Sequence, residues 1–88
     1  MNLSYTPSFV RLLKSLPDAL IEEALEKIEQ FRDSKNHEQL KVHKLSGRLK
    51  ERYAFSVNYK IRIVFSYLKT KPKEARLHAI GDHDVYDR

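Results

Sequence analysis

Residues 60–68, K-I-R-I-V-F-S-Y-L, constrain the fold of this chain more than any other segment. Apolar residues recur at every second position, and β-branched and aromatic side chains dominate, which is typical of a β-strand. One predicted face carries Ile61, Ile63, Phe65 and Tyr67, and the other carries Arg62, Val64, Ser66 and Leu68. Because the segment is too apolar for an exposed edge, we expect a central strand.

Arg62 is the unusual residue of this strand, because a guanidinium is costly to bury without a partner. Two interpretations stay open on the strand alone. The side chain either points to solvent on an open sheet face or holds an anion there. Residues 35–88 favour an anion, because they carry 13 of the 17 basic residues and only 6 of the 12 acidic ones. Such a charge favours a polyanion or an acidic protein as partner.

The length of 88 residues predicts a single domain over residues 1–88, with one modest core. The chain has no cysteine, which excludes disulfides and thiolate metal sites. The first ten residues, M-N-L-S-Y-T-P-S-F-V, do not resemble a signal peptide, and no apolar run approaches the roughly 20 residues that span a bilayer. We therefore expect a cytoplasmic protein without membrane contact.

Two helices are expected before the strands. Thr6 and Pro7 fit the N-cap and first position of one helix, and Asp18 fits the N-cap of a second that ends around residues 33–36. The second helix has an apolar stripe of Ile21, Ala24, Leu25, Ile28 and Phe31. With a short strand at residues 2–5 in front of them, these helices form an αα-hairpin.

The rest of the chain predicts a sheet. Strands are expected at residues 50–57, 60–68 and 74–80, with a hairpin turn near Asn58 and Tyr59. In the last strand Ala75, Leu77 and Ala79 should share one face, and Arg76, His78 and Ile80 the other. The expected class is α+β: a short N-terminal strand, a two-helix hairpin and an antiparallel three-stranded meander, with the helices on one sheet face.

Three regions of this layout can converge: the basic loop expected before the meander, with His43 and Lys44, then Arg62, and the C-terminal segment with His83 and Tyr86. Histidines beside cationic side chains fit RNA cleavage without a metal. In that reaction the 2′-OH attacks the adjacent phosphorus, imidazoles act as base and acid, and a guanidinium balances charge on the phosphate. An aromatic ring can stack on an unpaired base.

Each of these residues also has a structural interpretation. His43 can be a solvated surface imidazole, His83 can belong to a charge cluster with its two neighbours, Asp82 and Asp84, and Tyr86 can fill the core. His78, inside a strand, is expected to be structural. No metal site is expected at Asp82, His83 and Asp84, because adjacent residues do not converge on one ion.

Four motifs together resemble the RelE/ParE superfamily of bacterial type II toxins: K-L-S-G-R-L, R-Y-A-F-S-V, Y-K-I-R-I-V-F and A-I-G-D-H-D-V-Y. The resemblance covers nearly the whole chain. It implies a metal-independent endoribonuclease without a cofactor, which cuts mRNA in the ribosomal A site, contacts 16S rRNA and leaves a 2′,3′-cyclic phosphate and a 5′-hydroxyl. It also implies a cognate antitoxin, with the toxin monomeric alone and oligomeric with the antitoxin.

Site residues follow from the same resemblance. Arg62 matches the arginine that stabilises the transition-state phosphate, His83 the general acid of the YafQ-like subset, and Tyr86 the terminal aromatic. His43 corresponds to a candidate base. The phosphate-contacting set is Lys41, Lys44, Arg48, Lys50 and Arg52. RelE itself has an arginine where His83 stands, so this chain is closer to YafQ-like or HigB-like members.

Two alternatives remain open within the resemblance. ParE-type members share the fold, inhibit DNA gyrase and cleave no RNA. A degenerate member would bind its antitoxin only. The presence of Arg62, His83 and Tyr86 together favours the nuclease, because a gyrase inhibitor has no need of them.

Overall fold

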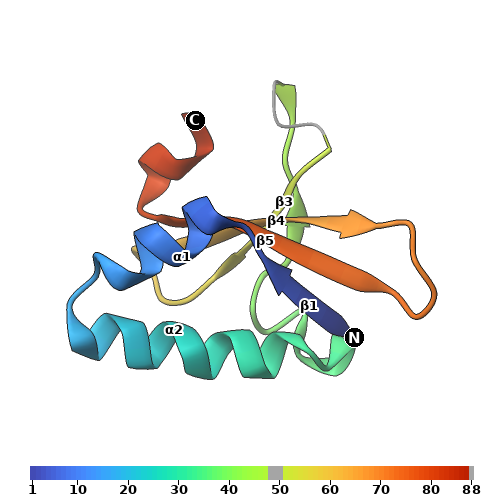
Figure 1. Cartoon of the computed structure of the whole chain (residues 1–88), viewed down its shortest axis with the longest axis horizontal. Coiled ribbons are helices and arrows are strands. Elements are labelled where there is room, and N and C mark those ends of the chain that lie inside the picture. The colour runs from blue at the N-terminus through green and yellow to red at the C-terminus, as the bar shows by residue number, and fades with distance from the viewer. Residues whose placement is uncertain (48–50, 88) are drawn as a thin grey trace.

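A computed structural model describes residues 1–47 and 51–87 of the chain (Figure 1). Strand β1 (Asn2–Tyr5) is followed by helices α1 (Pro7–Lys14) and α2 (Asp18–Phe31) and by a 3₁₀ turn at Ser34–Asn36. Then come strands β2 (His43–Lys44), β3 (Tyr53–Ser56), β4 (Arg62–Leu68) and β5 (Glu74–Gly81) and a C-terminal 3₁₀-helix (His83–Asp87). The expected α+β class is confirmed.

The strands form one five-stranded sheet in the order β1-β5-β4-β3-β2. β4 lies at its centre, as its apolar pattern predicted, and every pairing is antiparallel except that of β1 with β5. The sheet extends beyond the expected meander because β2 pairs with β3 through His43 and Lys44. A strand of two residues is too short to show a sequence period, so this edge was expected to be a loop.

Helix α1 begins as predicted. Thr6 Oγ1 accepts a hydrogen bond from the Phe9 N–H at 3.0 Å, and Pro7 takes the first helical position. The prediction for α2 was wrong by one residue: Pro17 is its N-cap, and Asp18 is already helical and makes no side-chain cap bond. Its carboxylate still lies in the first turn, where negative charge is favourable.

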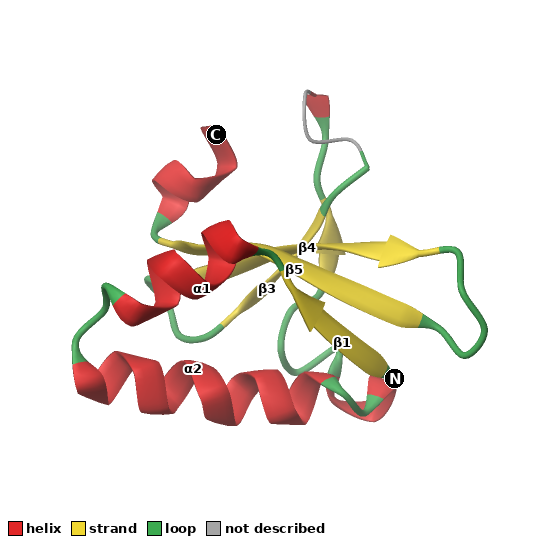
Figure 2. Ribbon diagram, viewed as in Figure 1, coloured by secondary structure: helices red, strands yellow, loops and turns green. Residues whose placement is uncertain are grey.

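The main core lies between the helices and one face of the sheet. The ring of Phe31 in α2 stacks on Phe55 at a centroid distance of 4.4 Å and meets Phe65 edge-on at 4.7 Å. All three side chains are fully buried. Figure 2 shows α2 running along this side of the sheet, with the C-terminal helix on the other side. No helix within residues 1–47 and 51–87 is long and apolar enough to cross a membrane.

A β-bulge in β5 changes which of its side chains reach the core. Val64 pairs with Ala79 but Phe65 pairs with Leu77, so His78 is an extra residue in the ladder. A bulge of this kind shifts the alternation of faces by one residue. The expected faces of β5 were therefore wrong beyond Leu77: Ile80 joins the core, while Ala79 lines a cavity on the opposite face.

Candidate functional site

The face of the sheet away from α2, called the open face here, carries the predicted catalytic arginine. Arg62 is half-buried at the start of β4, and its Nη1 donates hydrogen bonds to the carbonyl oxygens of Asn58 and Ile61. Arg62 pairs across the sheet with Gly81, the last residue of β5. The C-terminal helix begins two residues later, so it starts beside Arg62.

The C-terminal helix brings His83 and Tyr86 together. Their ring centroids are 5.7 Å apart and the rings are nearly perpendicular, at 79°. Val85 anchors the helix, because its side chain is buried while His83 is exposed. Asp82 caps the turn, accepting the Asp84 N–H at 2.9 Å.

Tyr86 connects this helix to Arg62. Burial raises the pKa of the Tyr86 phenol, and the nearby Arg62 guanidinium acts against that rise. The phenol is therefore protonated at neutral pH and can donate a hydrogen bond. Arg62, His83 and Tyr86 thus form one cluster from two elements that are far apart in the sequence. Across the described parts of the chain, no group of three His, Asp or Glu side chains is arranged to hold a metal ion.

His43 lies on the open face but outside this cluster. It pairs with Ala54, which pairs with Val64, so the three residues share one face. With strands spaced about 4.8 Å apart, His43 lies roughly 10 Å from β4 across the sheet. Its Nδ1 is 2.9 Å from the Lys41 carbonyl oxygen. Since a carbonyl only accepts, Nδ1 carries the proton and Nε2 is free to accept one.

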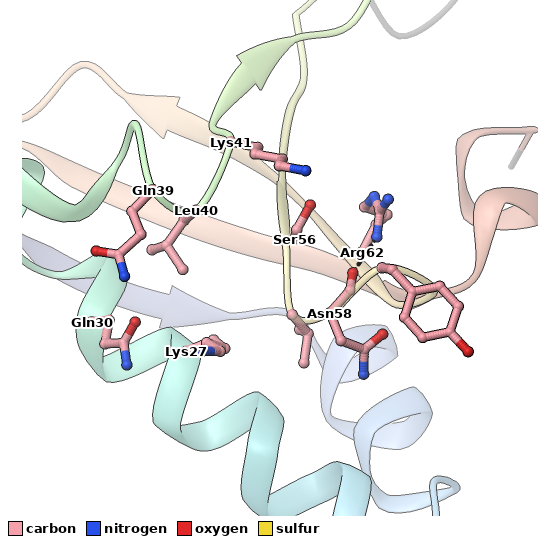
Figure 3. Close-up of a pocket in the computed structure, with 10 residues that line it drawn as sticks. Lys27, Gln30, Gln39, Leu40, Lys41, Ser56, Asn58 and Arg62 are labelled. Atoms are coloured by element: carbon pink, nitrogen blue, oxygen red, sulfur yellow. Dashed lines mark hydrogen bonds between the residues drawn. The ribbon is translucent and has the colours of Figure 1, made fainter.

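The predicted phosphate-binding residues do not all share one surface. Lys41 lines a cavity of about 290 Å³ together with Arg62, between α2 and the β3–β4 hairpin (Figure 3). Lys44 pairs with Tyr53, and Tyr53 packs on the main core. Lys44 is therefore on the core-side face of the sheet edge and not on the open face. Arg48 and Lys50 lie outside the described residues.

Arg52 belongs to a second polar cluster that the sequence did not predict. Its Nη1 donates to His78 Nε2 at 3.0 Å, and Ser66 Oγ lies 2.7 Å from the same nitrogen. His78 and Arg52 line a cavity of about 350 Å³ on the open face, which also includes Arg11 of α1. His78 therefore positions the Arg52 side chain. No sequence signal indicated this contact, because it depends on the bulge and on the pairing of three strands.

The Arg52–His78 contact predicts a pH effect on stability. Burial, helped by the charges of Arg52 and Arg76, lowers the pKa of His78 from 6.5 to about 4. Between these values the unfolded chain binds more protons than the folded one, so stability should fall as the pH drops through this window.

Urea midpoints at pH 7 and pH 4.5 measure this effect. We expect the midpoint of His78→Gln to fall less than that of the unaltered chain, since glutamine can accept the Arg52 bond and does not titrate. Equal losses in both proteins would show that His78 is not the responsible group.

Comparison with known proteins shows which solved structures share the fold of this chain. No family model matches the sequence, and no curated protein matches it. Solved structures do match. A chain of the RelE–RelB complex from Pyrococcus horikoshii OT3 is 21% identical, with 92% of each chain covered and a TM-score of 0.70. YafQ from Escherichia coli BL21(DE3) is 14% identical, with 96% of this chain and 94% of YafQ covered and a TM-score of 0.71.

A third structure, the YoeB/ParE toxin from Agrobacterium tumefaciens, is 16% identical, with 94% of this chain and 99% of that toxin covered and a TM-score of 0.68. All three matches extend over nearly the full length of both partners. The chain is thus a small α+β protein with a basic, partly covered sheet face. Its fold is shared with these three structures, as the resemblance of the four sequence motifs predicted.

Proposed function

We propose that this chain is the toxin of a type II toxin–antitoxin pair and that it cleaves mRNA on the ribosome without a metal ion. The observation that carries the proposal is the cluster of Arg62, His83 and Tyr86 on the open face. The fold supports the toxin role, because its structural neighbours include a YoeB/ParE toxin and a RelE–RelB complex. By analogy, the partner of this chain is an antitoxin.

The cluster supplies two of the functions that RNA transesterification needs. The 2′-oxygen forms a bond to phosphorus while the bond from phosphorus to the 5′-oxygen breaks. The Arg62 guanidinium balances the charge that develops on the non-bridging oxygens. His83, exposed at the start of the C-terminal helix, gives its proton to the departing 5′-oxygen. Tyr86 offers a ring for an adjacent base and a phenol hydrogen-bond donor.

His43 is the proposed base that takes the 2′-hydroxyl proton. Its free Nε2 suits that role, because the Lys41 carbonyl holds the other ring nitrogen protonated. In an in-line displacement the base and the acid work from opposite sides of the phosphorus. His43 comes from β2 at one edge of the sheet and His83 from the segment after β5, so a phosphodiester near Arg62 would lie between them.

The remaining basic residues are proposed to hold the RNA backbone and 16S rRNA. Lys41 is exposed next to Arg62, and Arg52 is held in place by His78. A net charge of +5 favours association with the ribosome and with an acidic antitoxin segment.

Mapping of 5′ ends on a reporter mRNA tests the proposal. After brief induction of the chain in cells, we expect new ends inside translated codons, each carrying a 5′-hydroxyl. A metal-dependent hydrolysis that leaves 5′-phosphates would contradict the proposed chemistry. An intact message during growth arrest, accompanied by DNA breaks, would favour the gyrase inhibitor instead.

A further inference from the structure

The cavity beside Arg62 has features that catalysis at a single phosphate does not require. This cavity, called the hairpin cavity here, has a volume of about 290 Å³ and lies between α2, the turn before β2 and the β3–β4 hairpin. Figure 3 shows Arg62 and Lys41 on one side of it, with Gln30 and Gln39 on the side away from Arg62. Its volume is at the small end for ligand sites, which fits one nucleotide unit better than a longer segment.

The charge of the hairpin cavity favours an anion. Lys27, Lys41 and Arg62 all line it, and no carboxylate is among its lining residues. None of the three forms an ion pair with any residue in the described ranges. A phosphate entering the cavity would therefore meet three cations that need not break an ion pair to bind it.

An unusually exposed aromatic side chain lies at the same cavity. Tyr59 lines it with 89% of its surface exposed, far more than any other large hydrophobic residue in the described chain. The turn that carries Tyr59 is well ordered by Asn58. The Asn58 Oδ1 accepts the N–H groups of Lys60 and Ile61 at 2.8 Å each, and its Nδ2 donates to Glu23 Oε1 at 2.7 Å. Because hydrogen bonds of Asn58 fix this turn, the exposed Tyr59 ring is suited to stack on a nucleobase.

Two amides complete the set of groups that a nucleotide would need. The side chains of Gln30 and Gln39 line the cavity and make no hydrogen bond to any residue that the structure describes. An amide can both donate to and accept from the edge of a base. An acidic peptide would use the cations but would leave the ring and both amides without a role, so the lining favours RNA.

We propose that the hairpin cavity binds the nucleotide next to the scissile phosphate, with its base on Tyr59, the base edge at Gln30 and Gln39, and its phosphate at Lys27 and Lys41. The inference rests on the proposed function, because Arg62 belongs to both the cavity and the catalytic cluster. It assigns base preference to residues of α2, of the turn before β2 and of the hairpin turn, away from the proposed acid and base.

Dinucleotides that resist cleavage test the site on the free protein. The probes are the 2′-O-methyl dinucleotides ApA, CpC, GpG and UpU, titrated into the full chain and followed by NMR. We expect saturable shifts at residues 58–60 and at the side-chain amides of Gln30 and Gln39, with the tightest binding for one base. Tyr59→Ala and Lys27→Gln should each raise the dissociation constant about tenfold, as expected for loss of one stacking or phosphate contact.

Two variants control this experiment. Lys14→Gln removes an exposed lysine from α1, outside the cavity, and should change the dissociation constant less than twofold. Tyr59→Phe keeps the stacking ring and should bind nearly as well as the unaltered chain. Because Tyr59 is exposed, its replacement should leave the fold intact.

The outcomes distinguish failure of the cavity proposal from failure of the nuclease proposal. Absent or non-saturable shifts, shifts unaffected by Tyr59→Ala and Lys27→Gln, or binding of a glutamate-rich peptide in place of the dinucleotides would each overturn the nucleotide site. If the message is cut in cells but the cavity binds no dinucleotide, the nuclease stands and the cavity proposal fails. Cavity binding without any message cleavage would reject the nuclease, and with it the placement of the bound nucleotide beside a scissile phosphate.

Discussion

Replacement of Arg62 by alanine is expected to abolish message cleavage, with a rate loss of about 100-fold or more, as found when a preorganised charge-stabilising donor is removed. Arg62 supplies the guanidinium of the open-face cluster, lies near Tyr86 and also lines the hairpin cavity. Its removal therefore deprives the phosphorane of its cation and weakens substrate placement. The measurement is the rate of appearance of 5′ ends on a translated reporter.

Arg62→Lys separates charge from geometry. Lysine keeps the positive charge but lacks the planar fork that grips two phosphate oxygens, so we expect only partial activity. The alanine variant should remain folded, because the hairpin turn is held mainly by the Asn58 side chain. Cleavage at the unaltered rate by a folded Arg62→Ala protein would remove this residue from the mechanism.

The second large effect is expected for His83→Ala, which should slow cleavage by about 100- to 10,000-fold, the usual contribution of a general acid. His83 is exposed and its ring meets Tyr86 edge-on, so its loss should hardly change the urea midpoint. Activity and stability should therefore separate in this variant, unlike in a variant of the buried core. Reporter cleavage and urea unfolding of the same protein measure the two effects.

His83→Gln and Asp84→Asn are the matched variants. Glutamine can hydrogen-bond at this position but cannot supply a proton at neutral pH, so it should be as inactive as alanine. Asp84 is exposed in the same short helix, and its replacement should leave cleavage unchanged. If His83→Gln retained full activity, His83 would have a positioning role and the acid would be another group.

The predicted site is only partly explained by local sequence. The motif around His83 and the pattern around Arg62 identified residues that the tertiary structure brings together, although their catalytic roles stay predictions. The position of Lys44 on the other side of the sheet edge follows from its pairing with Tyr53. That pairing sets the register between two strands, which the basic composition of residues 41–52 does not reveal.

Sequence by itself determined the class of the fold, the central place of β4 and the start of α1, because apolar periodicity and the Thr6 cap act over a few neighbouring residues. Tertiary structure alone decided the β5 bulge, the two-residue strand β2, the Arg52–His78 contact and the hairpin cavity. Each of these depends on how separate segments of the chain are aligned and packed together. Register is chosen by the packing of the whole sheet against the helices, and no local pattern encodes it.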